Sequence, residues 1–167
     1  MMTNLSKAYV DSPLGLLEIL GTDEAIKSIR FIEPDQPDDG VKSATVSPVL
    51  EACVEQFEAY FKGELREFSL PLDPDGTDFQ KAVWRELVNI PFGTTVSYLD
   101  IAKALNNEKA VRAVGMANGR NKLNIVIPCH RVIGSDGSLT GYGGGLWRKE
   151  WLLTHEGVLD KKQLPLF

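Results

Sequence analysis

The feature that most constrains this fold is a change of hydrophobic period along the chain. Residues 6–11, 15–20 and 25–32 are rich in leucine and β-branched residues and alternate roughly with a period of two, which predicts three strands. Turn residues at 12–15 and 21–23 connect them into a β-meander. Downstream the apolar spacing becomes helical, so the pattern predicts an α+β chain rather than an all-α or all-β one.

The first helix is expected after a polar, proline-rich loop at 33–40. Ser47 is a suitable cap and Pro48 a suitable first helical residue. Six residues at helical spacing form one apolar face: Leu50, Cys53, Val54, Phe57, Tyr60 and Phe61. Because Cys53 lies on this face, we predict that it is a core residue and not a reactive thiol.

Further helices are predicted in the second half of the chain. Thr77 and Gln80 form a capping box that opens a helix, and this helix ends at 91–93. Its inward residues are Phe79, Val83 and Leu87. A last helix is expected over about 146–155, with Gly157 closing it.

Two short helices across a tight turn lie between these elements. The first runs from a cap at 97–100 to about Leu105, and the second runs over about 108–118 and is closed by Gly119. Asparagines at 106–107 separate them. This spacing is typical of a helix-turn-helix.

Residues 72–76, Leu-Asp-Pro-Asp-Gly, have the composition of a linker. The chain is therefore predicted to contain an N-terminal α/β domain over 1–75, a second domain over 76–160 and a C-terminal tail over 161–167.

Charge differs between these parts, although the net charge of the whole chain is −5. The first 76 residues carry 6 basic and 15 acidic side chains, whereas residues 77–160 carry 10 basic and 8 acidic ones. The second part can therefore face nucleic-acid phosphates if its basic groups share one surface.

Composition also excludes several classes of protein. No run approaches the ~20 apolar residues that a membrane helix needs, so no membrane partner is expected. The N-terminus lacks a signal-peptide pattern, and the two cysteines form neither a disulfide framework nor a zinc site, which favours the cytoplasm. No phosphate-binding glycine loop or dinucleotide fingerprint is present, so no cofactor is expected.

The stretch Pro128-Cys129-His130-Arg131-Val132 sets one of two cysteines beside one of two histidines. A thiol is a useful nucleophile only as thiolate, and a neighbouring imidazole is the usual means of generating one. The alternative is a small buried core cysteine beside a structural histidine.

The second helix of the predicted helix-turn-helix has an unusual number of small residues, namely Ala110, Ala113, Gly115, Ala117 and Gly119. A glycine inside a helix costs about 1 kcal/mol relative to alanine, so something is expected to approach closely. Two interpretations stand: tight packing on a neighbouring helix, or close approach to a nucleic-acid groove with Arg112 projecting.

Together these motifs resemble the O6-alkylguanine-DNA alkyltransferases (methylated-DNA–protein-cysteine methyltransferases). The resemblance rests on stretches in family order at 79–84, 96–98, 111–115, 127–132, 140–145 and 149–157. The Pro-Cys-His-Arg-Val core with its downstream His-Glu-Gly is highly specific, while the N-terminal half is similar only in pattern. The family has a ribonuclease-H-like N-terminal domain and a helical, winged-helix-like second domain, and both are expected here.

The resemblance implies single-turnover chemistry on Cys129, which would accept the alkyl group of O6-alkylguanine and be spent. It implies that His130 removes the thiol proton through a water and that Glu156 holds His130. Tyr98 would donate a hydrogen bond to the guanine as negative charge develops on it. The alternatives are a structural histidine, a surface carboxylate and a core aromatic residue, respectively.

The resemblance also implies contacts with a base flipped out of the duplex. The carbonyls of Cys129 and Val132 would accept from the guanine amine, the Gly143 N–H would contact O6, and Tyr142 would form a mobile pocket wall. Arg131 is expected to be structural.

On the DNA side, Arg112 would fill the vacated stack, and Ala113 and Gly115 would lie in the minor groove. Asn121 would tie this recognition helix to the cysteine loop. The alternatives are a phosphate-contacting or solvated Arg112 and an ordinary turn asparagine. The expected partner is duplex DNA with alkylated guanine, bound by a monomer.

Two other interpretations compete with DNA repair by alkyl transfer. Non-catalytic alkyltransferase-like proteins share the fold but replace the cysteine, whereas Cys129 is present here. A cysteine hydrolase would use Cys129 and His130 but would not need Arg112 on a helix-turn-helix. The zinc site of some relatives is not expected, because the N-terminal half holds only Cys53 and no histidine.

Overall fold

A computed structural model describes residues 5–33 and 46–159 of the chain. Its fold is mixed α+β, as predicted, with a small sheet domain followed by a helical one. Two compact units are present, and residues 122–124 group with the first unit although they lie far along the sequence. The predicted loop beyond residue 33 and the predicted tail at 161–167 fall outside the described residues.

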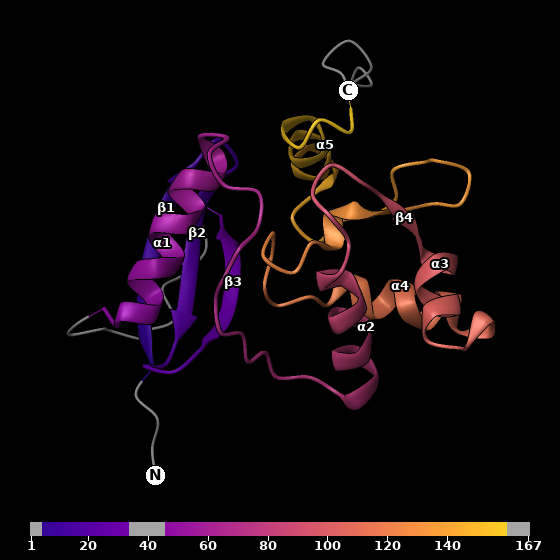
Figure 1. Ribbon diagram of the computed structural model, residues 1–167, viewed down its shortest axis with the longest axis horizontal. Coiled ribbons are helices and arrows are strands. Elements are labelled where there is room, and N and C mark those ends of the chain that lie inside the picture. Colours follow the sequence, from indigo (N-terminus) through magenta and orange to yellow (C-terminus); the bar gives the residue numbers. More distant parts are fainter. Residues whose placement is uncertain (1–4, 34–45, 160–167) are drawn as a thin grey trace. The chain divides into compact units, whose positions relative to one another are not determined.

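The first unit is built on a three-stranded antiparallel sheet with the order β1-β2-β3 (Figure 1). Its strands are β1 (Ser6–Ser12), β2 (Gly15–Gly21) and β3 (Ile26–Ile32), which confirms the predicted meander. Leu17, Ile19 and Ile29 are fully buried.

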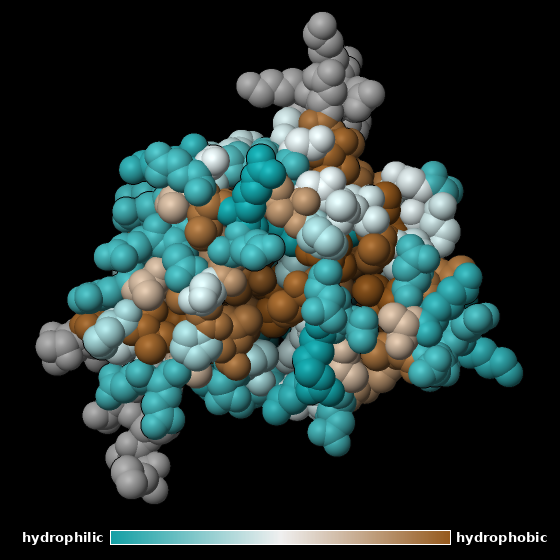
Figure 2. All heavy atoms as spheres, in the orientation of Figure 1, coloured by the Kyte–Doolittle hydropathy of each residue, from teal (hydrophilic) through white to brown (hydrophobic). Residues whose placement is uncertain are grey.

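Helix α1 (Pro48–Phe61) lies over the sheet of the first unit (Figure 1). It begins as predicted, because the Ser47 side chain accepts from the Leu50 N–H and Pro48 occupies the first turn. Its buried residues are Leu50, Cys53, Phe57 and Tyr60. Cys53 is therefore a core residue, as predicted, and side chains on the visible surface over α1 are mostly hydrophilic (Figure 2).

A segment from late in the chain completes the first unit. Leu123 forms a parallel bridge with Ile29 of β3, and the Asn124 side chain donates to the Ile29 carbonyl at 3.0 Å. Residues on both sides of this segment belong to the second unit. The sequence around Leu123 carries no local signal for this pairing, since a single bridge has no periodicity.

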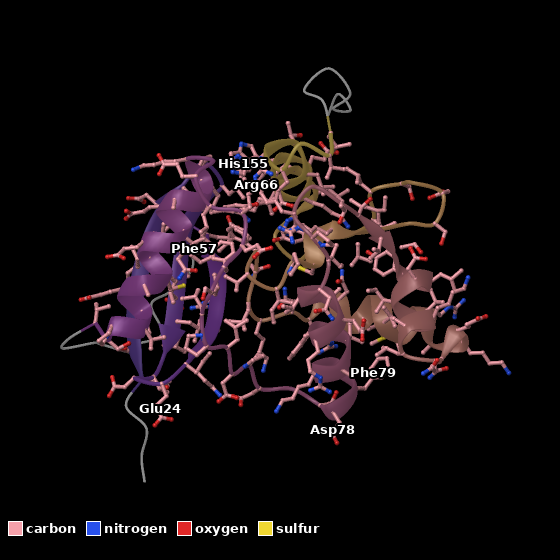
Figure 3. All side chains as sticks on the ribbon, viewed as in Figure 1. Glu24, Phe57, Arg66, Asp78, Phe79 and His155 are labelled. Carbon is pink, nitrogen blue, oxygen red and sulfur yellow. The ribbon has the colours of Figure 1, made fainter. Side chains whose placement is uncertain are left out.

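The second unit begins with α2 (Asp78–Val88), whose first turn carries Asp78 and Phe79 (Figure 3). The predicted capping box is present, with Thr77 and Gln80 bonding each other's backbone. Val83 and Leu87 are fully buried, and Phe79 is half-buried.

The helix-turn-helix consists of α3 (Tyr98–Ala104) and α4 (Val111–Gly119), with a 3₁₀ turn η1 (Glu108–Ala110) leading into α4. Ser97 and Asp100 form the predicted capping box of α3. The prediction that Gly119 closes α4 is wrong, because Gly119 is the last residue inside the helix and Arg120 is the cap with φ −98°. No left-handed glycine is needed there.

Helix α5 (Leu146–His155) is closed by Gly157, which follows the cap residue Glu156 and has φ +84°, as predicted. Two short strands, β4 (Val96–Ser97) and β5 (Val132–Ile133), form a parallel ladder. A second 3₁₀ turn, η2 (Cys129–Arg131), precedes β5. None of the helices described in residues 5–33 and 46–159 combines the length and the hydropathy of a membrane span.

The α2 capping box is expected to contribute measurably to stability. Thr77→Ala leaves the Gln80 N–H without its side-chain acceptor and should reduce the free energy of unfolding by about 1 kcal/mol. Urea denaturation of the two proteins measures this difference. Thr77→Ser keeps the hydroxyl and should match the parent; equal losses in the two variants would contradict the capping argument.

Candidate active site

The candidate nucleophile sits in the 3₁₀ turn η2. The sulfur-bearing residue Cys129 is only 3% exposed, and its N–H donates to the Ile127 carbonyl at 2.8 Å. Ile125, just upstream, has φ +73°, which is unusual for a β-branched residue and costs of order 1–3 kcal/mol. The loop that leads into Cys129 therefore has a strained backbone at Ile125, and the packing around the loop must hold it in place.

The Asn121 amide holds this loop, because its Nδ2 donates to the Ile127 carbonyl at 2.7 Å. It also forms a hydrogen bond that lowers the pKa of Cys129. Asn118, on α4, adds a longer bond from its Nδ2 to the Cys129 carbonyl at 3.4 Å. The two amides link the end of α4 to the cysteine turn.

Glu156 is the centre of a buried cluster of charged and polar groups. Its Oε2 lies 2.8 Å from His130 Nε2, and its Oε1 accepts from Arg131 Nε at 2.7 Å. A second guanidinium nitrogen, Nη2 of Arg131, donates to Oε2 at 3.0 Å. The remaining Nη1 donates to the Ile90 carbonyl at 2.7 Å. The carboxylate is therefore gripped by both side chains that follow the nucleophile.

These contacts determine the charge states of the cluster. Burial alone would raise the pKa of Glu156, but the hydrogen bonds and charges of His130 and Arg131 outweigh it and hold the pKa at about 2. Burial lowers the pKa of His130, and the Glu156 bond only partly opposes that shift. At neutral pH the cluster therefore contains a carboxylate, a guanidinium and a neutral imidazole.

The tautomer of His130 follows from its partner. A carboxylate can only accept, so Nε2 carries the imidazole proton, and Nδ1 is left with a lone pair. Nδ1 is buried and has no hydrogen-bond partner among the residues that the structure describes. His130 is thus arranged as a proton acceptor through Nδ1.

Cys129 itself is not a preformed thiolate. Burial raises its pKa to about 11, although the Asn121 hydrogen bond and the charge of Lys149 both act to lower it. The resting group at neutral pH is the thiol. Cys129 could therefore act as a nucleophile only if a neighbouring base removed its proton.

Lys149 is a component that the sequence did not single out. It is fully buried, and its Nζ donates to the Val132 carbonyl at 2.6 Å and to the Thr140 carbonyl at 3.0 Å. Burial lowers its pKa to about 8, an effect that Cys129 partly opposes. A mostly charged ammonium near the sulfur favours the thiolate.

Tyr98 occupies the first position of α3, directly after β4. Its hydroxyl lies 2.7 Å from Oγ1 of Thr140, and its ring lies 3.9 Å from where a Cβ on Gly115 would be. The β4–β5 ladder pairs Val96 with Val132, so the strand before Tyr98 is tied to the strand after the cysteine turn.

The α4 surface bears on the two interpretations of its small residues. Arg112, Ala113 and Gly119 are exposed, whereas Ala117 is buried. A Cβ on Gly115 would meet only the Tyr98 ring at ordinary contact distance, and one on Gly119 would meet nothing within 4 Å. A Cβ would therefore fit at both positions, so tight packing on a neighbouring helix does not require the two glycines. Close approach of this face to a nucleic-acid groove stays a prediction.

The loop before α5 contains the other two predicted pocket residues. The Tyr142 hydroxyl is buried, and burial together with the charge of Cys129 raises its pKa well above the usual range. Gly143 is exposed, and within the described part of the chain its N–H donates to no other group. The Val132 carbonyl already accepts from Lys149, but it retains a second lone pair.

Sequence reasoning thus identified Cys129, His130 and Glu156, and the structure brings the last two into contact. It assigned Arg131 a structural role, and that role extends to the site because Arg131 grips Glu156. Lys149 and Thr140 were missed as functional candidates. Lys149 did offer one signal, since a lysine four residues from Leu153 falls on the buried face of α5.

Two family models match the chain. One, described as the ribonuclease-like domain of 6-O-methylguanine DNA methyltransferase, matches residues 5–74. The other, described as its DNA binding domain, matches residues 78–158.

Similar proteins extend over nearly the full length of the chain. A methylated-DNA–protein-cysteine methyltransferase of Mycolicibacterium paratuberculosis is 46% identical, with 95% of this chain and 96% of the relative covered. One of Methanosarcina acetivorans is also 46% identical, covering 90% and 97%.

Solved structures also match nearly the full length of the chain. The crystal structure of O6-methylguanine methyltransferase from Mycobacterium tuberculosis matches with a TM-score of 0.82 and 42% identity, covering 98% of this chain and 96% of that one. A structure of the M. tuberculosis OGT in complex with DNA matches with a TM-score of 0.80 and 42% identity, covering 92% and 93%.

The Glu156 cluster predicts a specific acid sensitivity. In the unfolded chain the Glu156 carboxyl titrates near its ordinary value of 4.5, whereas in the folded protein its pKa is about 2. The stabilisation is therefore present above about pH 4.5 and is lost as the pH falls towards 2. Protonation of His130, whose folded pKa is lowered, acts in the same direction.

Chemical denaturation at several pH values measures this effect. Glu156→Gln should be less stable than the parent at neutral pH, because Arg131 loses its carboxylate partner, and should lose less stability between pH 4.5 and 2. Parallel stability curves for the two proteins in this range would contradict the assignment.

Proposed function

This chain belongs to the 6-O-methylguanine DNA methyltransferase family, and from that premise we propose that it repairs DNA by moving an alkyl group from O6-alkylguanine onto its own Cys129. The observation that carries the proposal is the buried Cys129 thiol followed directly by the neutral His130. The Glu156 carboxylate fixes Nε2 of this histidine and leaves Nδ1 as the proton acceptor. Alkyl transfer to sulfur needs both a nucleophile and a base, and needs no cofactor to carry the group.

The transfer is a single displacement at the alkyl carbon. The Cys129 sulfur forms a bond to this carbon as the bond to guanine O6 breaks, and the guanine leaves with the electron pair. The thiol proton passes to Nδ1 of His130, through a bridging water. Because the product is a thioether without a good leaving group, each molecule reacts once.

Each neighbouring charge assists this step. Proton uptake turns His130 into a cation, which the Glu156 carboxylate stabilises, and Arg131 keeps Glu156 ionised. The Lys149 ammonium favours the sulfur anion as the proton leaves. The thiolate therefore forms only during the transfer step, when its proton is removed. The resting thiol, with a pKa of about 11, is protected from side reactions.

The guanine would be held by groups around the cysteine turn. Tyr98 donates to the ring as negative charge develops, and the Gly143 N–H donates to O6. The carbonyls of Cys129 and Val132 accept from the exocyclic amine. Tyr142 forms the pocket wall.

DNA would be bound through α4 in the minor groove, with Ala113 and Gly115 allowing close approach. Arg112 enters the stack that the flipped base vacates, and flipping costs a few kcal/mol in an intact duplex. The exposed face of α4 supports this arrangement. The M. tuberculosis relative solved in complex with DNA supports DNA as the partner. We further propose that the protein acts as a monomer in the cytoplasm.

The two competing interpretations fit less well. A damage sensor without chemistry would not need a cysteine with a fixed histidine beside it. A hydrolase that uses Cys129 and His130 would not need an exposed Arg112 on the second helix of a helix-turn-helix.

The product itself provides the direct test of function. After incubation with a duplex oligonucleotide containing O6-methylguanine, the intact protein should gain the mass of one methylene unit, located on Cys129 by peptide mapping. Cys129→Ser should gain nothing, while Cys53→Ser should react like the parent because Cys53 is buried in the other unit.

Multiple turnovers per protein molecule, or an unmodified parent protein, would refute the proposal. Hydrolytic release of methanol without an adduct would favour the hydrolase.

The role of Arg112 can be separated from general DNA binding. Arg112→Ala should slow methyl transfer from duplex DNA about tenfold or more, because an uncompensated gap in the stack costs over ~1.4 kcal/mol. Transfer from free O6-methylguanine base should be unchanged, since no duplex has to be opened.

Single-turnover kinetics with both substrates measures these rates. Arg85→Ala, which removes an exposed arginine from α2, is the matched control for lost charge. Equal slowing in the two variants would mean that Arg112 contributes only general electrostatic attraction to DNA.

A further inference from the structure

A hydroxyl–hydroxyl contact joins two segments of the second unit that lie 42 residues apart. The Tyr98 hydroxyl and Thr140 Oγ1 are 2.7 Å apart, and either atom can be the donor. Both side chains are partly buried. Thr140 was not among the residues that the sequence pointed to, and the mechanism above makes no use of it.

Both partners of this contact are held firmly. The Thr140 carbonyl accepts from Lys149 Nζ at 3.0 Å, and the same Nζ donates to the Val132 carbonyl at 2.6 Å. Since Lys149 is fully buried on α5, it anchors the backbone of Thr140 to both α5 and β5. Tyr98 is fixed from the other direction, because β4, which ends at Ser97, pairs with β5.

The hydrogen count of the two hydroxyls limits what Tyr98 can do. A phenol has one hydrogen and can donate only one bond, whereas its oxygen can still accept. If Tyr98 donated to Thr140, its hydrogen would be occupied and it could not serve an incoming base. If Thr140 donates to Tyr98, the phenolic hydrogen is available and its direction is set.

We propose that Thr140 is a positioning residue for Tyr98, donating its hydroxyl hydrogen to the phenol oxygen so that the Tyr98 hydrogen is directed to the guanine. This inference rests on the proposed function, in which Tyr98 donates to the leaving base.

The consequence is a short relay of hydrogen bonds from Thr140 through Tyr98 to the base. Donors in series polarise one another, so a phenol that accepts a bond becomes a stronger donor. The gain is largest when negative charge builds up on the departing guanine, and it therefore acts on the rate of transfer more than on binding.

A purely structural role is the alternative to be excluded. In that case the Thr140 hydroxyl would only hold the loop before α5 in place. Its removal would then disturb the site whether or not residue 98 has a hydroxyl, and it would affect DNA binding as well as the rate.

The test is a double-mutant cycle in single-turnover kinetics with duplex DNA containing O6-methylguanine. Thr140→Val removes the hydroxyl at nearly constant shape and should lower the saturating rate constant about three- to tenfold, the range for losing one hydrogen bond. The DNA concentration at half-saturation should not change. Thr140→Ser should restore the parent rate, and Thr140→Ala serves as the second deletion if the valine variant does not fold.

The decisive comparison is made in the Tyr98→Phe background. There Thr140→Val should cause no further loss, because no phenol remains to be positioned. A loss of the same size in both backgrounds, or no loss beside Tyr98, would overturn the proposal. Ser138→Ala is the loop control, since its exposed hydroxyl bonds only within the loop, to Asp136.

Failure of the proposed function gives a different result. In that case the parent protein would form no adduct on Cys129, and none of the variants would have a transfer rate to compare.

Discussion

The bidentate grip of Arg131 on the Glu156 carboxylate is the interaction on which the site depends. Glu156 follows the last residue of α5, where the helix end carries partial negative charge and a buried carboxylate is unfavourable. Arg131 offsets this cost through Nε and Nη2, and its Nη1 reaches the Ile90 carbonyl. With Glu156 ionised and fixed, the tautomer of His130 is also fixed, and the ring presents Nδ1 as its acceptor.

A second network of hydrogen bonds is centred on Lys149, and the charge of Lys149 acts on the Cys129 sulfur. Its ammonium lies buried near the Cys129 sulfur and joins the Val132 and Thr140 carbonyls. In the proposed mechanism the first network prepares the base that removes the thiol proton, and the second favours the sulfur anion and holds the loop that reaches Tyr98. The two networks meet in the short segment from Cys129 to Val132, because His130 and Arg131 bind Glu156 and the Val132 carbonyl accepts from Lys149.

The features that the sequence predicted well are those whose determinants are local. The caps at Ser47, Thr77 and Ser97 depend on residues three positions away, and the structure has all of them. Gly119 shows the limit of this reasoning, because a glycine at a helix end need not adopt the left-handed conformation when the chain continues helically to Arg120. The pairing of Leu123 with Ile29, and the contacts of Arg131, Lys149 and Thr140, join segments far apart in sequence. Hydrophobic periodicity depends on residues close together in the sequence, so it does not predict contacts between distant segments. Only the resemblance indicated Glu156 as the partner of His130.

The resting site holds a thiol and a neutral histidine, and in the proposed mechanism the two become an ion pair only during transfer. Nitrogen-detected NMR of the His130 imidazole tests it most directly in the unreacted protein at neutral pH. We expect a neutral ring with its proton on Nε2 and an unprotonated Nδ1. A doubly protonated imidazolium beside a Cys129 thiolate in the resting protein would contradict it.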